Sequence, residues 1–222
     1  MNKPDNWQQR ARAQAELVLE RVLPAENSLP QRLHQAMRYA VLGGGKRLRP
    51  LLVLAAAEFG QSEAAAAEAA LAAVELVHVY SLVHDDMPAM DNDSLRRGKP
   101  TCHVQYDEAT ALLVGDALQT LAFDVLSRPN GLPAQRQLQM VHTLARASGS
   151  LGMAGGQAID LQSVGQHIGQ AELETMHRLK TGALIRAAVA LGALSCPDLD
   201  DAALARLDDY AAKLGLAFQV ID

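Results

Sequence analysis

The sequence predicts an all-α protein with a single domain over residues 1–222. Apolar residues make up 49 % of the chain, mostly as Ala, Leu and Val, whereas aromatic residues make up only 4 %. Long stretches of Ala, Leu, Glu, Gln and Arg favour helix over strand. In several segments the apolar residues recur three and four positions apart, as in a helix with one buried face. These observations indicate a helical protein with one hydrophobic core.

Turn-forming residues divide the chain into pieces of helix length. We expect breaks at 24–30, 43–45, 60–62, 87–107, 127–133, 165–169 and 195–200. The clearest helices lie between them, over about 63–84, 171–193 and 201–222. The last pattern is still running at Asp222 without a stop signal, so we expect the sequence to be part of a longer one.

Composition argues against several classes of partner. The formal net charge of -5 does not suit binding to nucleic acid. Cys102 and Cys196 form no CxxC pair, and no N-terminal signal run is present, which predicts a reducing compartment and a cytoplasmic protein. By this reading no apolar stretch approaches the roughly 18 residues that span a bilayer, so we expect no membrane insertion.

Three carboxylates, Asp85, Asp86 and Asp91, follow the helix of residues 63–84. On an ideal helix Asp85 and Asp91 would lie about 240° apart, but Pro88 breaks the helix between them. Mg²⁺ binds one or two carboxylates and completes its shell with water and phosphate oxygens. The segment therefore predicts a magnesium site for a diphosphate, with a polar loop after a helix as the alternative. The segment is not an EF-hand loop, because the Gly and the Glu that such a loop requires are absent from their positions.

Two basic clusters flank this segment. Arg96 and Arg97 offer adjacent guanidinium groups that suit phosphate. The run from Gly43 to Pro50 contains three glycines and three basic residues. It is not a Walker loop, because Ala40 and Arg47 stand where Gly and Ser or Thr are needed. Both clusters predict anion binding, and solvated basic residues beside a helix break are the alternative.

Six motifs together resemble one family. The strings GGGKRLRP, HVYSLVHDDMPAMDNDSLRRGKPT, GDALQTLAF, GGQAIDL, KTGALI and FQVID occur in the order and spacing of the trans-isoprenyl diphosphate synthases, most closely the bacterial farnesyl-forming members. The resemblance runs from about Leu29 to the last residue. It implies the isoprenoid-synthase fold, in which antiparallel helices surround a deep central cavity, and a homodimer.

The resemblance also implies a role for each matching residue. Three Mg²⁺ ions would be held by Asp85, Asp91, the supporting Asp86, and Asp222, which is all that this sequence contains of the second aspartate-rich motif. Isopentenyl diphosphate would bind Lys46, Arg49, His78 and Arg97; the allylic diphosphate would bind Arg96 and Lys180; and the cation would be stabilised by Thr181 and Gln219. We expect Lys180 to be paired only when diphosphate and metal are present, and Gln157 and Asp160 to be structural. A core histidine is the alternative for His78.

The implied reaction joins isopentenyl diphosphate to dimethylallyl or geranyl diphosphate, giving (2E,6E)-farnesyl diphosphate and diphosphate. Tyr80 resembles the aromatic residue that limits product length in farnesyl-forming members, although ideal helix geometry turns Ser81 more directly towards the cavity. A geranylgeranyl-forming synthase is the nearest alternative, and core packing is the alternative for Tyr80. Lys46, Arg49 and Arg97 argue against a terpene cyclase. A helical binding or scaffold subunit would be expected to lose some of these residues.

Overall fold

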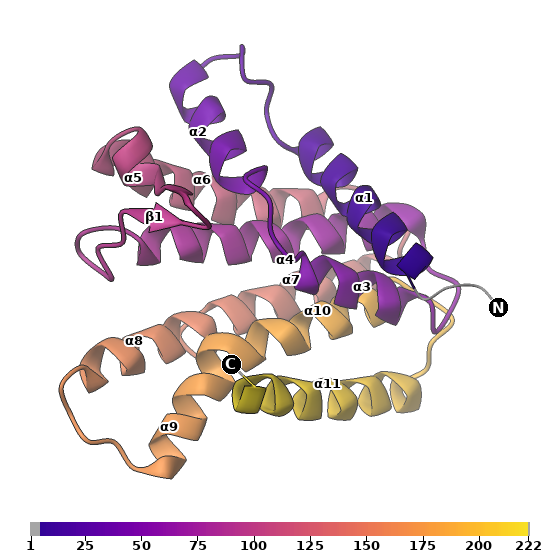
Figure 1. Ribbon diagram of the computed structural model, residues 1–222. Helices are drawn as coiled ribbons and strands as arrows, with labels where there is room; N and C mark the ends of the chain where they lie inside the picture. Colours follow the sequence, from indigo (N-terminus) through magenta and orange to yellow (C-terminus); the bar gives the residue numbers. More distant parts are fainter. Residues whose placement is uncertain (1–4, 222) are drawn as a thin grey trace.

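The computed structural model describes residues 5–221, and it confirms the all-α class (Figure 1). The elements are α1 (Asp5–Val22), α2 (Gln31–Val41), α3 (Leu48–Ala57), α4 (Ala64–Asp85), β1 (Leu95–Arg96), β2 (Lys99–Pro100), α5 (Cys102–Gln105), α6 (Glu108–Ser127), α7 (Ala134–Ser148), α8 (Met153–Ser163), α9 (Gln170–His177), the π-helical turn η1 (Arg178–Gly182), α10 (Ala183–Leu194) and α11 (Asp201–Ile221). The seven predicted breaks all separate helices.

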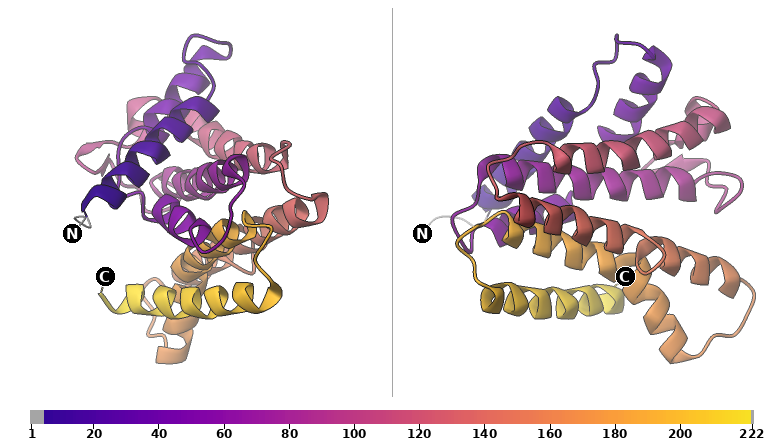
Figure 2. Two further views of the ribbon diagram at one scale, coloured as in Figure 1. Left: turned by 90° about the vertical axis from the view of Figure 1, so that its right-hand side faces the viewer. Right: turned by 180° about the vertical axis from the view of Figure 1, so that it is seen from behind.

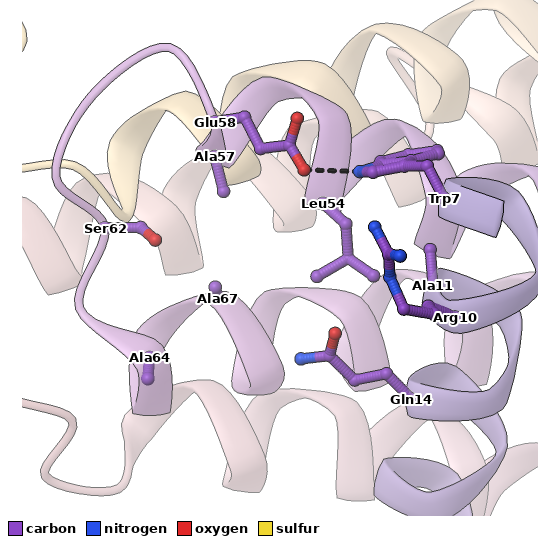
Figure 3. Close-up of a pocket in the computed structure, with 10 residues that line it drawn as sticks. All are labelled: Trp7, Arg10, Ala11, Gln14, Leu54, Ala57, Glu58, Ser62, Ala64 and Ala67. Carbon is purple, nitrogen blue, oxygen red and sulfur yellow. Dashed lines mark hydrogen bonds between the residues drawn. The ribbon is translucent and has the colours of Figure 1, made fainter. Parts of the chain in front are cut away.

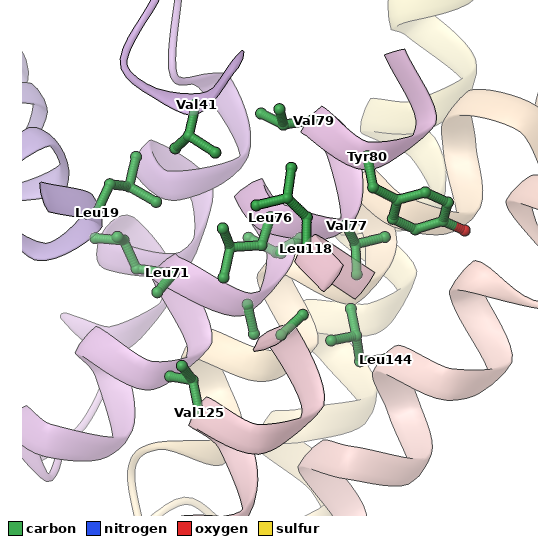
Figure 4. Packing of buried hydrophobic residues seen from close by; sticks show 14 of the residues in the cluster. Leu19, Val41, Leu71, Leu76, Val77, Val79, Tyr80, Leu118, Val125 and Leu144 are labelled. Atoms are coloured by element: carbon green, nitrogen blue, oxygen red, sulfur yellow. The ribbon is translucent and has the colours of Figure 1, made fainter. Parts of the chain in front are cut away.

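Helix α4 forms the centre of the core. It packs against α3, α6 and α10, and its side chains are buried on nearly every side between Ala66 and Val83. The single inward stripe expected from the sequence is therefore too narrow, because a helix that is apolar all round belongs in the interior. Figure 4 shows Leu71 and Leu76 of α4 among the buried residues, with Leu118 of α6 beside them. This helix carries the acidic segment at its C-terminal end.

Two helices correct the expectation that no apolar stretch is long enough to cross a membrane. Among the described residues, α4 with 22 residues and α6 with 20 residues meet that test by length and composition. In the apolar window of α4, 72 % of the residues are buried inside the protein, against 44 % in that of α6. The length of α4 is thus explained by its place in the core, and α6 leaves more apolar surface uncovered.

The second half of the chain packs along the first. In Figure 2, α10 and α11 run side by side, and α8 and α9 extend away from the other helices. Helix α10 approaches α3 closely at Gly192, where a Cβ atom would lie 2.2 Å from the carbonyl oxygen of Val53. The C-terminal part of α11 passes η1, since Gly215 lies against Gly182. The fold thus brings the end of the chain next to the π turn.

Three local features were not predicted. A further break over 149–152 separates α7 from α8. The segment 87–107 contains a short antiparallel hairpin, with Leu95 opposite Pro100, and the single turn α5. The helix expected over 171–193 is interrupted by η1, and π turns occur frequently at functional sites.

A cavity of about 290 Å³ lies between α1, α3 and the start of α4 (Figure 3). It is lined by Trp7, Arg10 and Gln14 of α1, and the Trp7 indole donates a hydrogen bond to Glu58. Ala64 and Ala67 line it at the first turn of α4. The acidic segment follows the last turn of the same helix, about 30 Å away at 1.5 Å per residue. This cavity is therefore separate from the predicted site.

Candidate active site

The acidic segment begins where α4 ends. Asp85 is the last residue of α4, and the chain then folds back so that the Asp91 backbone N–H donates a hydrogen bond of 2.8 Å to the Asp85 carbonyl oxygen. Asn92 follows with a positive φ of 53°. The helix thus stops before Pro88, as the sequence predicted, and Asp85 and Asp91 come together.

The Asp85 carboxylate is held in an unfavourable electrostatic environment. Its pKa is raised to about 6, first by burial and then by the negative charges of Asp91 and Asp86, while Lys180 and Arg96 act in the opposite direction. Burial and like charges both disfavour the ionised form. A cation bound between Asp85 and Asp91 would relieve this unfavourable charge, so the donor set fits Mg²⁺.

The carboxylates alone do not form a complete metal site. Among the described residues, no group of three or more His, Cys, Asp or Glu side chains is arranged to hold a metal ion. Mg²⁺ commonly takes one or two carboxylates and fills its remaining positions with water and phosphate oxygens. Asp85 and Asp91 therefore suit a metal that is shared with a phosphate ligand.

Asp86 is occupied by Arg96 of the hairpin. The Arg96 Nε atom lies 2.9 and 2.8 Å from the two Asp86 oxygens, and Nη2 lies 2.6 Å from Oδ1. Asp86 is only 3 % exposed, whereas the Arg96 side chain is about one-third exposed. A bidentate pair of this kind fixes the guanidinium in one orientation. Asp86 thus holds Arg96 in place near Asp85. The predicted contact of Arg96 with the allylic diphosphate stays a prediction.

Arg49 and Arg97, two of the residues predicted to bind isopentenyl diphosphate, lie near His78, and the position of Lys46 relative to His78 stays a prediction. The pKa of His78 is well below its ordinary value, first because of burial and then because of the positive charges of Arg49, Arg97 and Arg96. The Nε atom of Arg49 is buried and has no hydrogen-bond partner among the described residues, and burial lowers the pKa of Arg49. Buried polar groups usually have partners. An enclosed donor among several cations therefore fits an anionic ligand.

The glycine loop and the hairpin meet at Arg97. Its guanidinium donates a hydrogen bond to the carbonyl of Gly44, and a Cβ atom on Gly45 would lie 2.6 Å from Arg97 Nη1. Gly45 has a φ of 151°, which side chains rarely adopt. Lys46 follows and is exposed. The absence of a side chain at Gly45 thus lets Arg97 lie against the loop that carries Lys46.

Lys180 and Thr181 lie on η1, and both are partly buried. Lys180 Nζ lies 2.5 Å from Asp160 Oδ2 of α8. The expectation that Lys180 is paired only with diphosphate and metal present was therefore wrong. The Lys180 charge still acts on Asp85, so η1 faces the end of α4. Asp160 holds the lysine in place near the acidic segment.

Tyr80 lies among the buried residues of the core (Figure 4). Its ring packs edge to face on His84, with ring centroids 5.9 Å apart. Burial raises the pKa of its phenol. Ser81 is partly buried and donates a hydrogen bond of 2.8 Å to the His78 carbonyl. The role of Tyr80 and Ser81 in product length stays a prediction. The Gln219 side chain and Asp222 lie outside the described residues.

Sequence reasoning missed the role of Arg47. It was counted among the basic residues of the glycine loop, yet it is 3 % exposed and bonded to Glu16 and Glu75. One signal was available, because Glu75 is an isolated acidic residue in the apolar part of α4. Such a residue predicts a buried cationic partner, although the pattern does not identify which one.

Comparisons with known proteins agree with this geometry. Residues 30–222 match the protein family described as polyprenyl synthetase. The farnesyl diphosphate synthase of Escherichia coli K12 is 54 % identical over 190 residues, covering 85 % of this chain and 64 % of the relative. A probable farnesyl diphosphate synthase of Bradyrhizobium diazoefficiens is 48 % identical, covering 99 % of this chain and 67 % of the relative. The chain thus spans about two-thirds of the length of these relatives.

Solved structures match in fold as well as in sequence. A putative farnesyl-diphosphate synthase from Marinomonas sp. MED121 has a TM-score of 0.89 and 45 % identity, covering 99 % of this chain and 79 % of that one. An FPP/GFPP synthase from Zymomonas mobilis has a TM-score of 0.92 and 42 % identity, covering 98 % and 79 %. The helices therefore adopt the isoprenoid-synthase fold.

Proposed function

The chain belongs to the polyprenyl synthetase family, and from this we propose that its full-length gene product is a Mg²⁺-dependent trans-prenyltransferase. It would condense isopentenyl diphosphate with dimethylallyl or geranyl diphosphate to give (2E,6E)-farnesyl diphosphate and diphosphate. Residues 1–222 would form a single polyprenyl synthetase domain, an assignment supported by the one large hydrophobic cluster to which α1 to α8 and α10 contribute buried residues.

One observation carries the proposal. Two clusters of like charge lie around the last turns of α4: the carboxylates of Asp85 and Asp91, and the cations Arg49 and Arg97 around His78. His78 and Asp85 are seven residues apart on one helix, which is about 10.5 Å along its axis. Two diphosphates, one bound with metal and one without, would satisfy both clusters.

The metal-assisted half of the site would hold the allylic diphosphate. Asp85 and Asp91 would bind Mg²⁺, together with Asp222 and the residues that follow it in the family pattern, and three ions are proposed for the complete site. Bound Mg²⁺ supplies positive charge where negative charge develops on the departing diphosphate. Arg96, held by Asp86, and Lys180, held by Asp160, add fixed positive charges there.

The metal-free half would hold isopentenyl diphosphate. Arg49 and Arg97 would bind its oxygens together with Lys46 and His78, and Arg49 would thereby satisfy its buried Nε donor. Thr181, with Gln219, would stabilise the allylic cation. The proton lost at the end would pass to the released diphosphate, so no side-chain base is required. Exclusion of water would protect the cation from quenching.

The oligomeric state and the cellular location are proposed from the family resemblance. Leu112 and Leu113 of α6 are 48 % and 54 % exposed, on a helix whose apolar window is less than half buried. A second subunit covering this face would form the proposed homodimer. Buried thiols at Cys102 and Cys196 suit the proposed cytoplasmic location.

Product analysis tests the proposal directly. The full-length gene product is incubated with Mg²⁺, isopentenyl diphosphate and, in separate reactions, dimethylallyl, geranyl or farnesyl diphosphate, and the prenyl products are sized. We expect a C15 product from the first two and little elongation of the third. Asp85→Asn should lose most activity, whereas Glu26→Gln, at an exposed carboxylate between α1 and α2, should retain it. Absence of any prenyl product would overturn the proposal, and efficient C20 formation would replace farnesyl with geranylgeranyl.

A further inference from the structure

Arg47 is the least exposed of the three basic residues Lys46, Arg47 and Arg49. Its side chain is 1 % exposed. Nε lies 2.7 Å and Nη2 3.0 Å from the two Glu16 oxygens, Nη1 lies 2.8 Å from Glu75 Oε1, and Nη2 also donates to the Val41 carbonyl at 2.8 Å. Burial alone would lower the pKa of Arg47, but its bonds to Glu16 and Glu75 outweigh burial and raise it. Arg47 is thus fully engaged within the protein and cannot bind a phosphate.

The backbone at Arg47 accounts for this burial. Arg47 has φ 51° and ψ 35°, in the left-handed region that residues with a side chain rarely adopt. It precedes α3, and its carbonyl accepts the backbone N–H of Leu51 at 3.0 Å. Such a conformation carries strain and persists only when surrounding contacts enforce it. The ion pairs of the guanidinium group are contacts of that kind.

The partners of Arg47 come from two helices, and one of them is the helix of the active site. Glu75 is 2 % exposed and lies on α4, three residues before His78 and therefore on the same face. Glu16 lies on α1 and its side chain is 44 % exposed. The Arg47–Glu75 pair thus joins the loop that carries Lys46, and the first turn of α3 that carries Arg49, to the turn of α4 that carries His78.

We propose that Arg47 is a positioning residue for the homoallylic diphosphate: its ion pairs with Glu75 and Glu16 fix the junction between the glycine loop, which ends in Lys46, and the start of α3, which carries Arg49. This inference rests on the proposed function. Two carboxylates surround the guanidinium, so its charge contributes little attraction to an anion. Its action on binding is geometric. Arg97 contacts the same loop at Gly44 and Gly45, so a shift of the loop would also move Arg97.

The substitution Arg47→Lys tests this with the charge kept. Lysine retains the positive charge but cannot make the forked contact to Glu16 and Glu75 together. Glu75→Gln removes the other side of the pair. Arg38→Lys is the matched control, because Arg38 is a mostly buried arginine of α2 that binds Glu20 and the Pro24 carbonyl, away from the loop. Each variant is made in the full-length gene product, and its thermal midpoint is recorded.

The readouts separate positioning from folding. We expect KM for isopentenyl diphosphate to rise about 10- to 100-fold in Arg47→Lys and in Glu75→Gln, because small misplacements of binding groups have effects of this size. KM for geranyl diphosphate should stay within about twofold, and Arg38→Lys should change neither constant by more than that. Equal rises in both KM values, or a lower thermal midpoint with unchanged KM values, would overturn the inference.

Direct binding keeps the inference separate from the proposed activity. The Kd for isopentenyl diphosphate is measured calorimetrically for the wild type and each variant, without turnover. Weaker binding in Arg47→Lys supports positioning even if no prenyl product forms, and unchanged binding refutes it even if the enzyme is active. If Arg47→Lys does not fold, Glu16→Gln at the half-exposed partner is measured instead, with a smaller rise in Kd expected and an unchanged Kd counting against the inference.

Discussion

Removal of the Asp85 charge should stabilise the metal-free protein. The pKa of Asp85 is raised from 3.8 to about 6, a difference that corresponds to roughly 3 kcal/mol between the ionised and neutral forms. Asp85 is only partly buried, so solvent screening reduces this figure. We therefore expect Asp85→Asn to raise the free energy of unfolding by about 1–2 kcal/mol at about pH 7.5 in the presence of a chelator.

The pH dependence follows from the direction of the shift. A raised pKa means that the folded state binds the Asp85 proton more tightly than the unfolded chain does. The resulting stabilisation is complete below a pH of about 3.8 and is lost as the pH rises through about 6. The free energy of unfolding of the wild type should therefore rise relative to that of Asp85→Asn as the pH falls from about 7.5 to about 5.

Urea denaturation at both pH values is the assay. Glu26→Gln serves as the control, because it removes one exposed negative charge from the turn between α1 and α2. An Asp85→Asn protein no more stable than the wild type at about pH 7.5, or a difference that does not narrow at about pH 5, would refute the reasoning. Addition of Mg²⁺ with inorganic diphosphate should make the wild type the more stable of the two proteins, since only the wild type keeps both carboxylates that are proposed to bind the metal.

Three further predictions address product length, packing and the thiols. Tyr80→Ala should shift the main product from C15 towards C20, while Tyr80→Phe, which keeps the ring, should not; unchanged C15 output from the alanine variant, measured by product sizing, would remove Tyr80 from that role. Gly192→Ala should lower the free energy of unfolding by about 2–3 kcal/mol, because its Cβ atom would meet a backbone carbonyl of α3 that cannot move aside, whereas Gly169→Ala has open space around its Cβ atom and should change stability by less than about 1 kcal/mol in the same denaturation assay. Cys102 and Cys196 are buried, and burial raises the pKa of the Cys102 thiol to about 12, so an aromatic disulfide reagent should label the native protein at least about tenfold more slowly than the urea-unfolded protein; equal rates would show that the thiols are accessible.

Local patterns predicted the helices and the meeting of Asp85 with Asp91. Gly and Pro mark most chain breaks because they act on the backbone where they stand, and Pro88 is an example of that kind. The π turn at Lys180 could not be found in this way, since the sequence carries no signal for which carbonyl each backbone N–H of a helix binds. Periodicity reports the buried face and not the hydrogen-bond register.

Contacts between distant residues were the least predictable part of the site. Lys180 and Asp160 are 20 residues apart, and Arg47 and Glu75 are 28 apart. Nothing in either local sequence identifies the partner, because each pair depends on how two helices pack. The motifs predicted which residues belong to the site, but the structure was needed to find that one basic residue of the motif, Arg47, is bonded within the protein.

The burial of α4 also constrains how the sequence can vary in length. His78 and Asp85 are separated by helix alone. Inserting or deleting one residue between them would rotate one of the two side chains about the helix axis by about 100° relative to the other and shift it by about 1.5 Å along the axis. No surface loop is available there to absorb the change. After Asp85 the chain leaves the helix, and residues 88 and 89 are exposed. Length differences among related sequences should therefore be tolerated between the aspartates and excluded between the histidine and the first aspartate.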